Sequence, residues 1–402
     1  MHNTRINKVY GETQGENASS LRSQLSPLLL LTAVFFLNFI SRIIFGPLMP
    51  SIENDLGISH GEAGIFFLLI SFGYFIALLS SGFISSRLMH RRTIIHSSIV
   101  VGTVLLIISQ ISNLWGIRLG LLLLGMATGI YLPSGIATLT SLINPRYWGK
   151  AIAIHELAPN IGFVAAPLLT EALLLSFSWR GVLVFFGAAA ILAGLAFARF
   201  GKGGEFPGEP LSFRASKIIF SEPAFWIMII LFSLGITGSL GIFTMLPLYL
   251  IIESGMDRNW ANTLIGLSRI PGIGISFLAG WANDRLGPRR TLMAIFFFTG
   301  LTTVLLGLTS GYWTIIMIFL QSIIAICFFP PGLAALSSIG PPNTRNVAVS
   351  LTIPVAFTLG SGAIPIGIGI MADADSFSLA ITLTGVLILM GTVLSYYLPI
   401  RK

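Results

Sequence analysis

The chain has 402 residues, of which 54% are hydrophobic and only 9% are charged, and its mean hydropathy is strongly positive. Soluble domains carry about 25% charged residues, so this composition excludes a soluble globular protein. The formal net charge of +8 would suit an acidic partner such as nucleic acid, and the positions of the charges decide whether that interpretation holds.

Apolar runs long enough to cross a membrane follow one another along almost the whole chain. Crossing the hydrocarbon core takes roughly 20 apolar residues in a helix. The runs show no strict alternation, and lipid demands internally satisfied backbone groups, so they predict helices. We expect an all-α membrane protein with twelve spans, at about 27–47, 62–84, 94–112, 115–143, 151–175, 180–200, 223–252, 261–282, 291–309, 312–338, 347–371 and 377–399.

The charges indicate how the chain crosses the membrane. With a cytoplasmic amino terminus, 18 of the 23 Lys and Arg residues fall in cytoplasmic segments. The opposite loops are short and acidic, with Glu53, Asp55, Glu253, Asp257, Asp373 and Asp375. Because cytoplasmic loops carry an excess of Lys and Arg, we expect both termini in the cytoplasm and the chain in the cell membrane. The net positive charge is then explained by the orientation of the chain in the membrane, and no nucleic-acid partner is expected.

Features of enzymes and sensors are missing from the sequence. The single cysteine, Cys327, lies inside a predicted span, so neither a disulfide framework nor a cysteine metal site is expected. Of five histidines only His155 lies well inside a span, and no extramembrane segment is long enough to fold alone. We therefore expect no enzyme, no metal and no cofactor.

The segment GKGGEFPGEPLSFRASK at 201–217 divides the chain, because its glycine and proline residues disfavour a continuous helix. Six predicted spans lie on each side of it. We expect a disordered cytoplasmic amino terminus at 1–24, a six-helix bundle at 25–200, a flexible cytoplasmic linker at 201–220 and a second six-helix bundle at 221–400.

One polar sequence occurs twice, directly after the second span of each half. SGFISSRLMHRRT at 81–93 returns as AGWANDRLGPRRT at 279–291. An offset of 198 residues aligns Gly82, Arg87, Arg91 and Arg92 with Gly280, Arg285, Arg289 and Arg290. FGPLMPSI at 45–52 and FTMLPLYL at 243–250 are a weaker pair at the same offset. The halves are therefore predicted to be repeats, placed the same way up because each has an even number of spans.

These loops resemble the motif G-x-x-x-D-R-x-G-R-R of the major facilitator superfamily. The second copy, GWANDRLGPRR, is close to it, with one residue inserted before the arginine pair. The first copy has Ser86 in place of the acid and Met89 in place of the glycine. The resemblance covers about residues 25–400. It implies a secondary transporter with alternating access, in which these loops take part in the conformational change and Asp284 has the role of the acid.

Ionisable residues inside the membrane are costly and mark transport pathways. Arg42 and Arg269 lie in opposite halves, each roughly 10 to 12 Å from the outer end of its span. Two guanidinium groups facing one cavity would clamp a carboxylate or a similar anion. The alternative is that each arginine braces the structure or snorkels toward the interface.

Subfamily resemblances point the same way. RIIFGPLMP at 42–50 and HELAPNIGFVAAPLL at 155–169 resemble the organic-phosphate and anion:cation symporters, whose first-helix arginine binds the substrate anion. That resemblance implies an anion-binding role for Arg42. Arg269 is similar to the eighth-helix arginine of monocarboxylate and oxalate transporters.

Glu156 lies roughly 9 Å from the cytoplasmic face. A buried carboxyl group suits a proton carrier, because desolvation favours its neutral form. The alternative is a structural acid that pairs with a cytoplasmic arginine. Asn160 shares its helix face, whereas His155 is expected to point elsewhere. Four further polar residues could line the cavity or simply join helices: Asn38, Tyr131, Tyr249 and Gln321.

The sequence as a whole predicts a monomeric secondary transporter in the lipid bilayer that moves a small organic anion, with the proton as its coupling ion. The alternative is a drug or metabolite exporter of the same fold. Such exporters often carry G-x-x-x-G-P-x-x-G-G in the fifth span, where this chain reads GFVAAPLLTE from Gly162.

Overall fold

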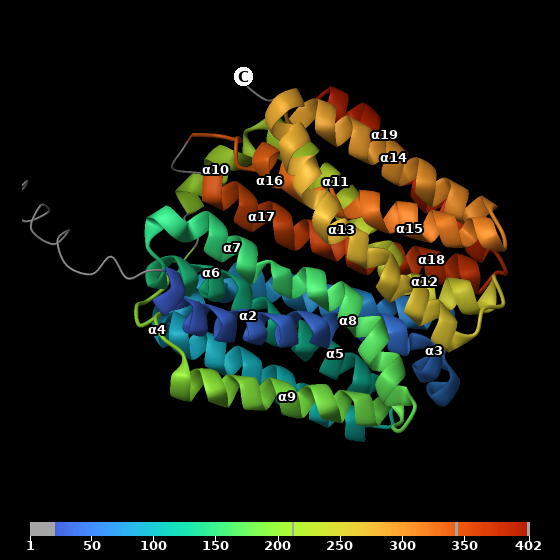
Figure 1. Ribbon diagram of the computed structural model, residues 1–402, viewed down its shortest axis with the longest axis horizontal. Helices are drawn as coiled ribbons and strands as arrows, with labels where there is room; N and C mark the ends of the chain where they lie inside the picture. Colours follow the sequence, from blue (N-terminus) through green and yellow to red (C-terminus); the bar gives the residue numbers. More distant parts are fainter. Residues whose placement is uncertain (1–20, 211–212, 342–344, 400–402) are drawn as a thin grey trace, which may run out of the picture.

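The structure is a computed structural model that describes residues 21–210, 213–341 and 345–399, and within these ranges all regular structure is helical (Figure 1). The first half contains α2 (Leu21–Ile43), α3 (Phe45–Leu56), α4 (His60–Gln110), α5 (Leu114–Gly129), α6 (Tyr131–Leu142), η1 (Pro145–Tyr147), α7 (Trp148–His155), α8 (Leu157–Leu174) and α9 (Trp179–Phe200). The second contains α10 (Phe213–Phe220), α11 (Pro223–Ile236), η2 (Thr237–Gly241), α12 (Ile242–Ile252), α13 (Arg258–Leu286), α14 (Pro288–Leu308), α15 (Tyr312–Ile326), α16 (Phe329–Leu336), α17 (Arg345–Phe357), η3 (Thr358–Ala363), α18 (Ile364–Ala372) and α19 (Phe377–Tyr396).

Eleven helical stretches among the described residues are long and apolar enough to cross a membrane. One of them, α4, has 51 residues, more than twice the roughly 20 that one crossing needs. Its backbone leaves the helical region at Met89, with φ 67° and ψ 154°, so α4 comprises two crossings joined by a tight turn. The described chain therefore crosses twelve times, and the predicted fold class is confirmed.

The turn at Met89 repeats the backbone of its counterpart in the second half. Gly287, 198 residues later, has φ 80° and ψ 159°. Glycine adopts a positive φ freely, whereas a side chain there costs roughly 1 to 2 kcal/mol. The first half thus has the same turn conformation as the second, although it lacks the glycine that would adopt this conformation without strain.

Two spans of the second half contain π-helical segments, η2 and η3, which the sequence analysis did not predict. They pack closely, because a Cβ atom on Gly241 would lie 2.3 Å from the carbonyl oxygen of Gly360. Wide turns of this kind expose backbone carbonyls to side-chain donors and recur at functional sites. The glycine-rich stretch at 360–370, interpreted as a helix kink or packing site, begins inside η3.

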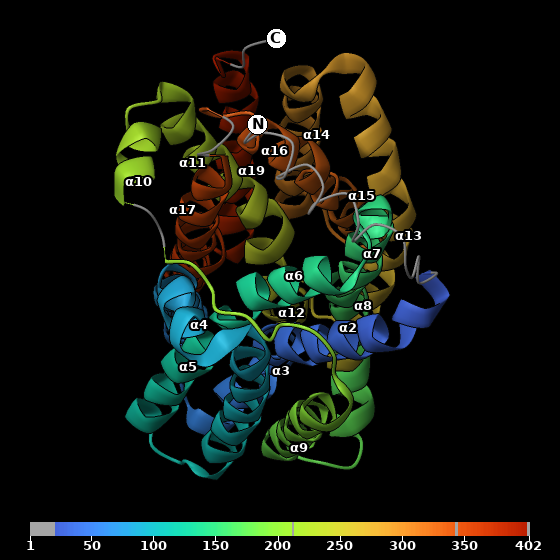
Figure 2. The same ribbon diagram turned by 90° about the vertical axis from the view of Figure 1, so that its left-hand side faces the viewer.

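The two halves lie side by side, with α2 to α9 on one side and α11 to α19 on the other (Figures 1 and 2). Gly46 and Thr244, also 198 residues apart, lie against each other: a Cβ atom on Gly46 would be 3.3 Å from the Cα atom of Thr244. Equivalent positions meet in this way where a pseudo-two-fold axis passes between repeats. The limits of the two bundles remain a prediction.

The segment 201–210 runs across the turn in the middle of α4 and the end of α6 (Figure 2). The N–H groups of His90 and Arg91 donate to the carbonyl oxygens of Phe206 and Gly204, at 3.2 and 2.8 Å. Residues 213–220 then form α10. Residues 201–210 of the predicted flexible linker are therefore bound to the first half, and residues 213–220 form a helix that packs against α11 and α17 of the second half.

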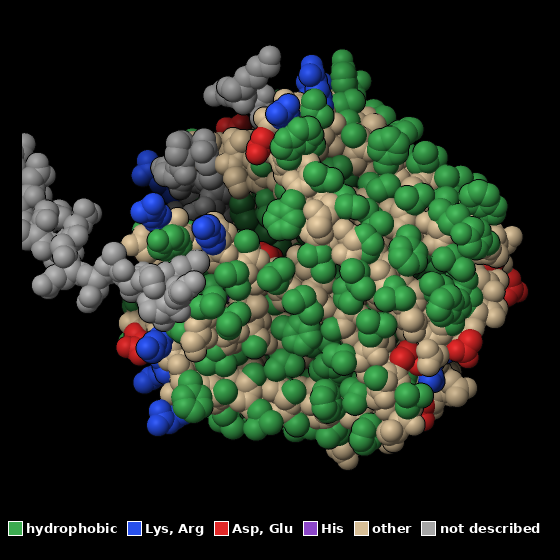
Figure 3. Space-filling view, viewed as in Figure 1, with side chains coloured by type: hydrophobic (Ala, Val, Ile, Leu, Met, Phe, Trp, Pro, Cys, Tyr) green, Lys and Arg blue, Asp and Glu red, His purple; other side chains and the backbone are tan. Residues whose placement is uncertain are grey.

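The molecule has a basic and an acidic end. The basic end carries the turns at Met89 and Gly287 with Arg87, Arg92, Arg285 and Arg290, and the acidic end carries Glu53, Asp55, Asp257 and Asp373. Most of the visible Lys and Arg side chains lie at the left-hand end of Figure 3, where the surface is also hollowed. At the acidic end the halves touch through α3 and α12, α4 and α18, and α8 and α13.

Candidate functional site

Arg42, at the end of α2, is buried with 8% of its surface exposed. Its guanidinium carbon lies 4.2 Å from the ring centre of Tyr74, 5.2 Å from Phe39 and 5.6 Å from Phe357. No ion pair with an acid involves it among the described residues, and its Nε atom has no hydrogen-bond partner there. The aromatic faces thus take the place of a counter-ion.

Arg269, on α13, is 2% exposed. Its Nη2 atom donates to the carbonyl oxygen of Ser239 in η2 at 2.8 Å. The guanidinium carbon lies 4.8 Å from the ring centre of Phe163 and 5.1 Å from that of Phe243. Its Nε and Nη1 atoms have no hydrogen-bond partner in the described part of the chain. Two donor nitrogens of a buried cation are therefore available to an acceptor.

The two arginines lie on one aromatic cluster formed by Phe39, Phe163 and Phe243. The rings of Phe39 and Phe163 meet edge to face at 5.2 Å, and those of Phe163 and Phe243 at 5.0 Å. Arg42 contacts the first ring and Arg269 contacts the other two. The predicted pair from opposite halves thus shares one environment, with phenylalanine rings between the guanidinium groups.

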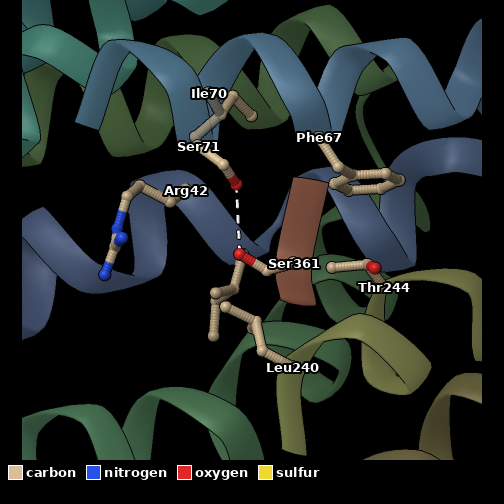
Figure 4. Close-up of a pocket in the computed structure, with 8 residues that line it drawn as sticks. Arg42, Phe67, Ile70, Ser71, Leu240, Thr244 and Ser361 are labelled. Atoms are coloured by element: carbon tan, nitrogen blue, oxygen red, sulfur yellow. Dashed lines mark hydrogen bonds between the residues drawn. The ribbon is translucent and has the colours of Figure 1, made fainter. Parts of the chain in front are cut away.

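A small pocket lies beside Arg42, between the halves (Figure 4). Its lining is Arg42, Ile43, Phe67, Ile70, Ser71, Leu240, Thr244 and Ser361. The hydroxyl groups of Ser71 and Ser361 share a hydrogen bond of 3.0 Å across it. In Figure 4 the guanidinium of Arg42 points away from that bond, so an anion would reach it from another side.

The four other predicted lining residues are buried, and each makes a hydrogen bond to another helix. Asn38 Nδ2 donates to Ser97 Oγ at 3.2 Å, Tyr131 Oη to Leu31 O at 2.9 Å, Tyr249 Oη to Leu306 O at 2.8 Å and Gln321 Nε2 to Gly238 O at 2.8 Å. Gln321 binds η2 one residue before the carbonyl that Arg269 binds. Of the four residues, Gln321 is therefore the one that η2 connects to the arginine site. A substrate-binding role for all four stays a prediction.

Glu156 lies at the break between α7 and α8, with 47% of its side chain exposed. This is more exposed than the buried carboxyl that the sequence predicts. Its Oε1 atom lies 3.6 Å from Nδ1 of His155, so His155 does not point elsewhere as expected. Asn160 donates to the Glu156 carbonyl oxygen at 2.8 Å.

The first of the repeated loops is in contact with the segment 201–210. A Cβ atom on Gly82 would lie 2.4 Å from the carbonyl oxygen of Glu209. Arg91 donates to the carbonyl oxygens of Gly201 and Ala198 at 2.6 and 2.9 Å. Arg87 lies over the ring of Phe83, and Arg92 is exposed.

The second loop makes fewer contacts with the rest of the described chain than the first. Nothing would lie within 4 Å of a Cβ atom on Gly280, and Arg285 and Arg289 lie over the rings of Trp281 and Tyr396. Arg290 is exposed. Asp284 is exposed too, and no ion pair or side-chain hydrogen bond involves it in the described residues. Any locking role of this acid must therefore belong to another conformation.

The change of Asp284 to Asn is accordingly expected to slow transport more than Ser86→Ala, because only the second loop has an acid that can pair during the conformational cycle. The thermal stability of the purified protein should stay the same in both variants, since neither side chain anchors this conformation. Initial uptake rates in proteoliposomes would test this. Equal rates would show that the acid has no mechanical role.

Two features of the site escaped the sequence analysis. Glu171 is 5% exposed and pairs with Arg258, yet it lies only about one turn from the end of its span, where an acid looks like an ordinary boundary residue. The π-helix η2 supplies the carbonyls that Arg269 and Gln321 bind, and η3 packs against it. Their glycine residues were a signal, although glycine in a membrane helix more often marks close packing.

Twelve membrane crossings in two related halves, with buried cations at the boundary between them, define a multi-pass membrane transporter. The model of the Major Facilitator Superfamily matches residues 31–352 and 259–402. The chain belongs to this superfamily, a family of transporters rather than enzymes. Its relatives include a protein named as a membrane sensor, UhpC of Escherichia coli, 23% identical over 330 residues, covering 76% of this chain and 74% of that one.

Individual relatives are distant. The chain is 23% identical over 323 residues to multidrug resistance protein MdtL of Klebsiella pneumoniae, covering 78% of this chain and 80% of that one. It is 21% identical over 335 residues to the 4-hydroxybenzoate transporter PcaK of Pseudomonas putida, covering 73% and 74%. The fold is similar to the crystal structure of a bacterial homologue of the human lysosomal transporter Spinster, inward-facing and unoccupied, with a TM-score of 0.82, 16% identity and coverage of 94% and 97%.

Proposed function

We propose that the protein is a proton-coupled transporter of a small organic anion, which binds between Arg42 and Arg269. The observation that carries this proposal is the state of Arg269. It is a buried guanidinium with two nitrogens lacking acceptors, and no acid among the described residues neutralises it. An unpaired buried charge is costly, and cation–π contacts offset only about 2 kcal/mol of that cost. A substrate carboxylate would supply the missing acceptors and charge.

The rings around the arginines favour anions with an aromatic or other planar apolar body. Phe39, Phe163 and Phe243 form a surface on which such a body can stack or pack edge to face. The similarity to a protein named as a 4-hydroxybenzoate transporter supports the same substrate class. We therefore place aromatic carboxylates ahead of aliphatic ones.

In the alternating-access cycle that we propose, the structure corresponds to a state that is closed at one end and open at the other. The halves touch at the acidic end, and the surface is hollowed at the basic end. With the positive-inside topology predicted from the sequence, the basic end faces the cytoplasm. The structure then corresponds to a state from which substrate exchanges with the cytoplasm, and transport requires the acidic end to open in turn.

Thermal stabilisation of the purified protein would test the substrate class, because a ligand that binds only the folded state raises its apparent stability. The panel contains benzoate, 4-hydroxybenzoate, aliphatic carboxylates, phosphate and lipophilic cations. We expect stabilisation by the carboxylates, strongest for the aromatic ones. Stabilisation by lipophilic cations alone would support a drug exporter, the class to which the similarity with MdtL points, and would overturn the proposed anion.

For the coupling proton we propose Glu156, a half-exposed acid at the break between α7 and α8, 3.6 Å from Nδ1 of His155. Glu156→Gln mimics the protonated form permanently. Net proton-driven accumulation should be lost, while exchange of labelled for unlabelled anion persists, because exchange needs no change of protonation in each turnover.

Both activities would be measured in proteoliposomes with an imposed pH gradient. Glu205→Gln is the control, since Glu205 is an exposed acid that pairs with Arg91 away from the site. Accumulation that survives in Glu156→Gln would show that another group carries the proton.

A further inference from the structure

A buried carboxylate, Glu171, joins the two halves at the acidic end. It is the one acid among the described residues that is buried, and it lies on the last turn of α8. Its Oε1 atom accepts a hydrogen bond from Asn262 Nδ2 at 2.6 Å and lies 3.2 Å from Arg258 Nε. Its Oε2 atom accepts from the same Nε at 3.3 Å. Both partners belong to α13, in the other half.

The same two partners also bind α3. Asn262 Nδ2 donates to the carbonyl oxygen of Pro47 at 3.3 Å, and Arg258 Nη1 donates to Ser51 Oγ at 3.4 Å. Glu171 is thus the centre of a polar network in which α13 contacts two helices of the first half. Separating the halves at this end would break all of these bonds.

A second carboxylate contact, made by Asp373, is related to the first by the internal repeat. Asp373 follows α18 and accepts hydrogen bonds from the N–H groups of His60 and Gly61, at 2.8 and 2.9 Å, where α4 begins. The offset of 198 residues aligns His60 with Arg258, and Asp373 with Leu175, one turn beyond Glu171. In each case an acid at the end of one helix binds the start of a helix in the opposite half.

The two contacts differ in how they should respond to protons. Asp373 is exposed, and although burial would raise its pKa, hydrogen bonds from Gly61, Ser59 and His60 outweigh that effect and lower the pKa. A lowered pKa means that this contact is lost only when the pH falls below the usual range of an aspartate. Glu171 is enclosed and is balanced by one partner cation.

The charged groups around Glu171 are few. On the elements packed against α8, those toward the acidic end are Arg258 on α13, Glu53 and Asp55 on α3, and Arg180 on α9. Arg42 on α2 and Arg269 on α13 lie at the aromatic cluster, and Lys150, Arg199, Asp284 and Arg285 lie toward the basic end. Glu53 lies 3.0 Å from His60, Asp55 pairs with Arg180, and Arg269 lies on the aromatic cluster. Among the described residues, Arg258 alone makes an ion pair with Glu171, so the charge of this pair balances only while Glu171 is ionised.

We propose that Glu171 is a proton-binding site that controls opening of the acidic end. When Glu171 is ionised, it holds α8 against α13. When it binds a proton, Arg258 loses its counter-ion, and the closed state becomes less stable relative to the open state. A proton that binds the open state better must shift the population toward it. This inference rests on the proposed function for its role in transport, because a proton arriving on that side would favour the state that takes up substrate there.

The distance between spin labels on the two halves at the acidic end would test the proposal. Ser112 and Ser310 are exposed and lie in loops at this end, one in each half. Cys327 is the single cysteine, so Cys327→Ser gives a background for labelling Ser112→Cys and Ser310→Cys. In the full-length protein in nanodiscs, we expect the label distance to lengthen as the pH falls from about 7 to about 4, the range in which carboxyl groups ordinarily bind protons.

Glu171→Gln should give the long distance over the whole pH range, with loss of the pH response. Arg258→Gln is a second variant, in case the first folds poorly: it should give the long distance at high pH, because the ionised Glu171 then has no counter-ion in the closed state. Asp55→Asn removes an exposed acid at the same end whose ion pair stays within one half, and it should keep the normal response. A normal response in Glu171→Gln, or no response before any substitution, would overturn the proposal.

Histidine side chains ordinarily change charge in the upper part of this range, and His60 lies at the same end. His60→Gln should therefore keep the pH response, and its loss would place the proton on His60 and overturn the assignment to Glu171. Benzoate stabilisation, measured on the same samples, separates this proposal from the proposed function. Stabilisation without a pH response defeats only the Glu171 site, and a pH response without stabilisation defeats only the anion.

Discussion

Replacing Arg269 with lysine is expected to lower anion uptake by about 100-fold or more, while the protein still folds and inserts. The change keeps the charge but removes the planar guanidinium that donates to Ser239 and stacks between Phe163 and Phe243. Hydrogen bonds to charged groups contribute about 1.5 to 3 kcal/mol each, and a lysine cannot offer two parallel donors to one carboxylate. Uptake by proteoliposomes measures the effect.

Arg118→Lys is the matched control. Arg118 pairs with Glu62 at 3.0 Å and lies over Trp115, away from the aromatic cluster. Its variant should transport normally. If Arg269→Lys also transports with unchanged kinetics, the guanidinium holds the helices together and does not bind substrate.

The fold could be predicted because its signals are long and repeated. Twelve apolar runs and two copies of one loop fix the number of crossings and the relation of the halves. The backbone of the two loops is more alike than their sequences are, because Met89 adopts the same positive φ as the glycine at 287. Packing of the whole repeat outweighs the local cost, which no single-position pattern reveals.

The candidate site could be predicted only in part, because the sequence gives depth in the membrane but not direction. Arg42 and Arg269 were expected at similar depths, yet whether they face each other, the lipid or a ring depends on how the helices rotate. The three phenylalanines between them look in the sequence like any other apolar residues. Glu156 and His155 show the same limit, because the break between α7 and α8 lets neighbouring residues meet.

The two acids for which we propose proton binding, Glu156 and Glu171, lie at opposite ends of one helix. Both lie on or beside α8, 15 residues apart, which corresponds to roughly 22 Å along a helix. Glu156 lies toward the basic end at the break between α7 and α8, and Glu171 lies at the acidic end between the halves. One helix thus carries one acid near the solvent of each side, an arrangement in which substrate binding and gate opening could each respond to protons.

Closure of the acidic end depends on a glycine, and this gives the second large prediction. A Cβ atom on Gly64 of α4 would lie 2.6 Å from the Cα atom of Ile366 and 2.8 Å from the carbonyl oxygen of Pro365, both in α18. These are backbone atoms, which cannot move aside as a side chain can. The two helices belong to opposite halves, so they touch this closely only while the end is closed.

Gly64→Val should therefore destabilise the closed state without harming either half. Overpacking costs about 1 to 3 kcal/mol, and at 3 kcal/mol the ratio of open to closed molecules shifts by more than 100-fold. We expect uptake to be lost and the label distance between Ser112→Cys and Ser310→Cys to stay long over the whole pH range. Gly367→Val is the control, because nothing lies within 4 Å of a Cβ atom at that position of α18. It introduces the same side chain into one of the two helices and should transport normally. Normal uptake in Gly64→Val would show that α4 and α18 do not need this contact, and that the acidic end closes through its polar contacts alone.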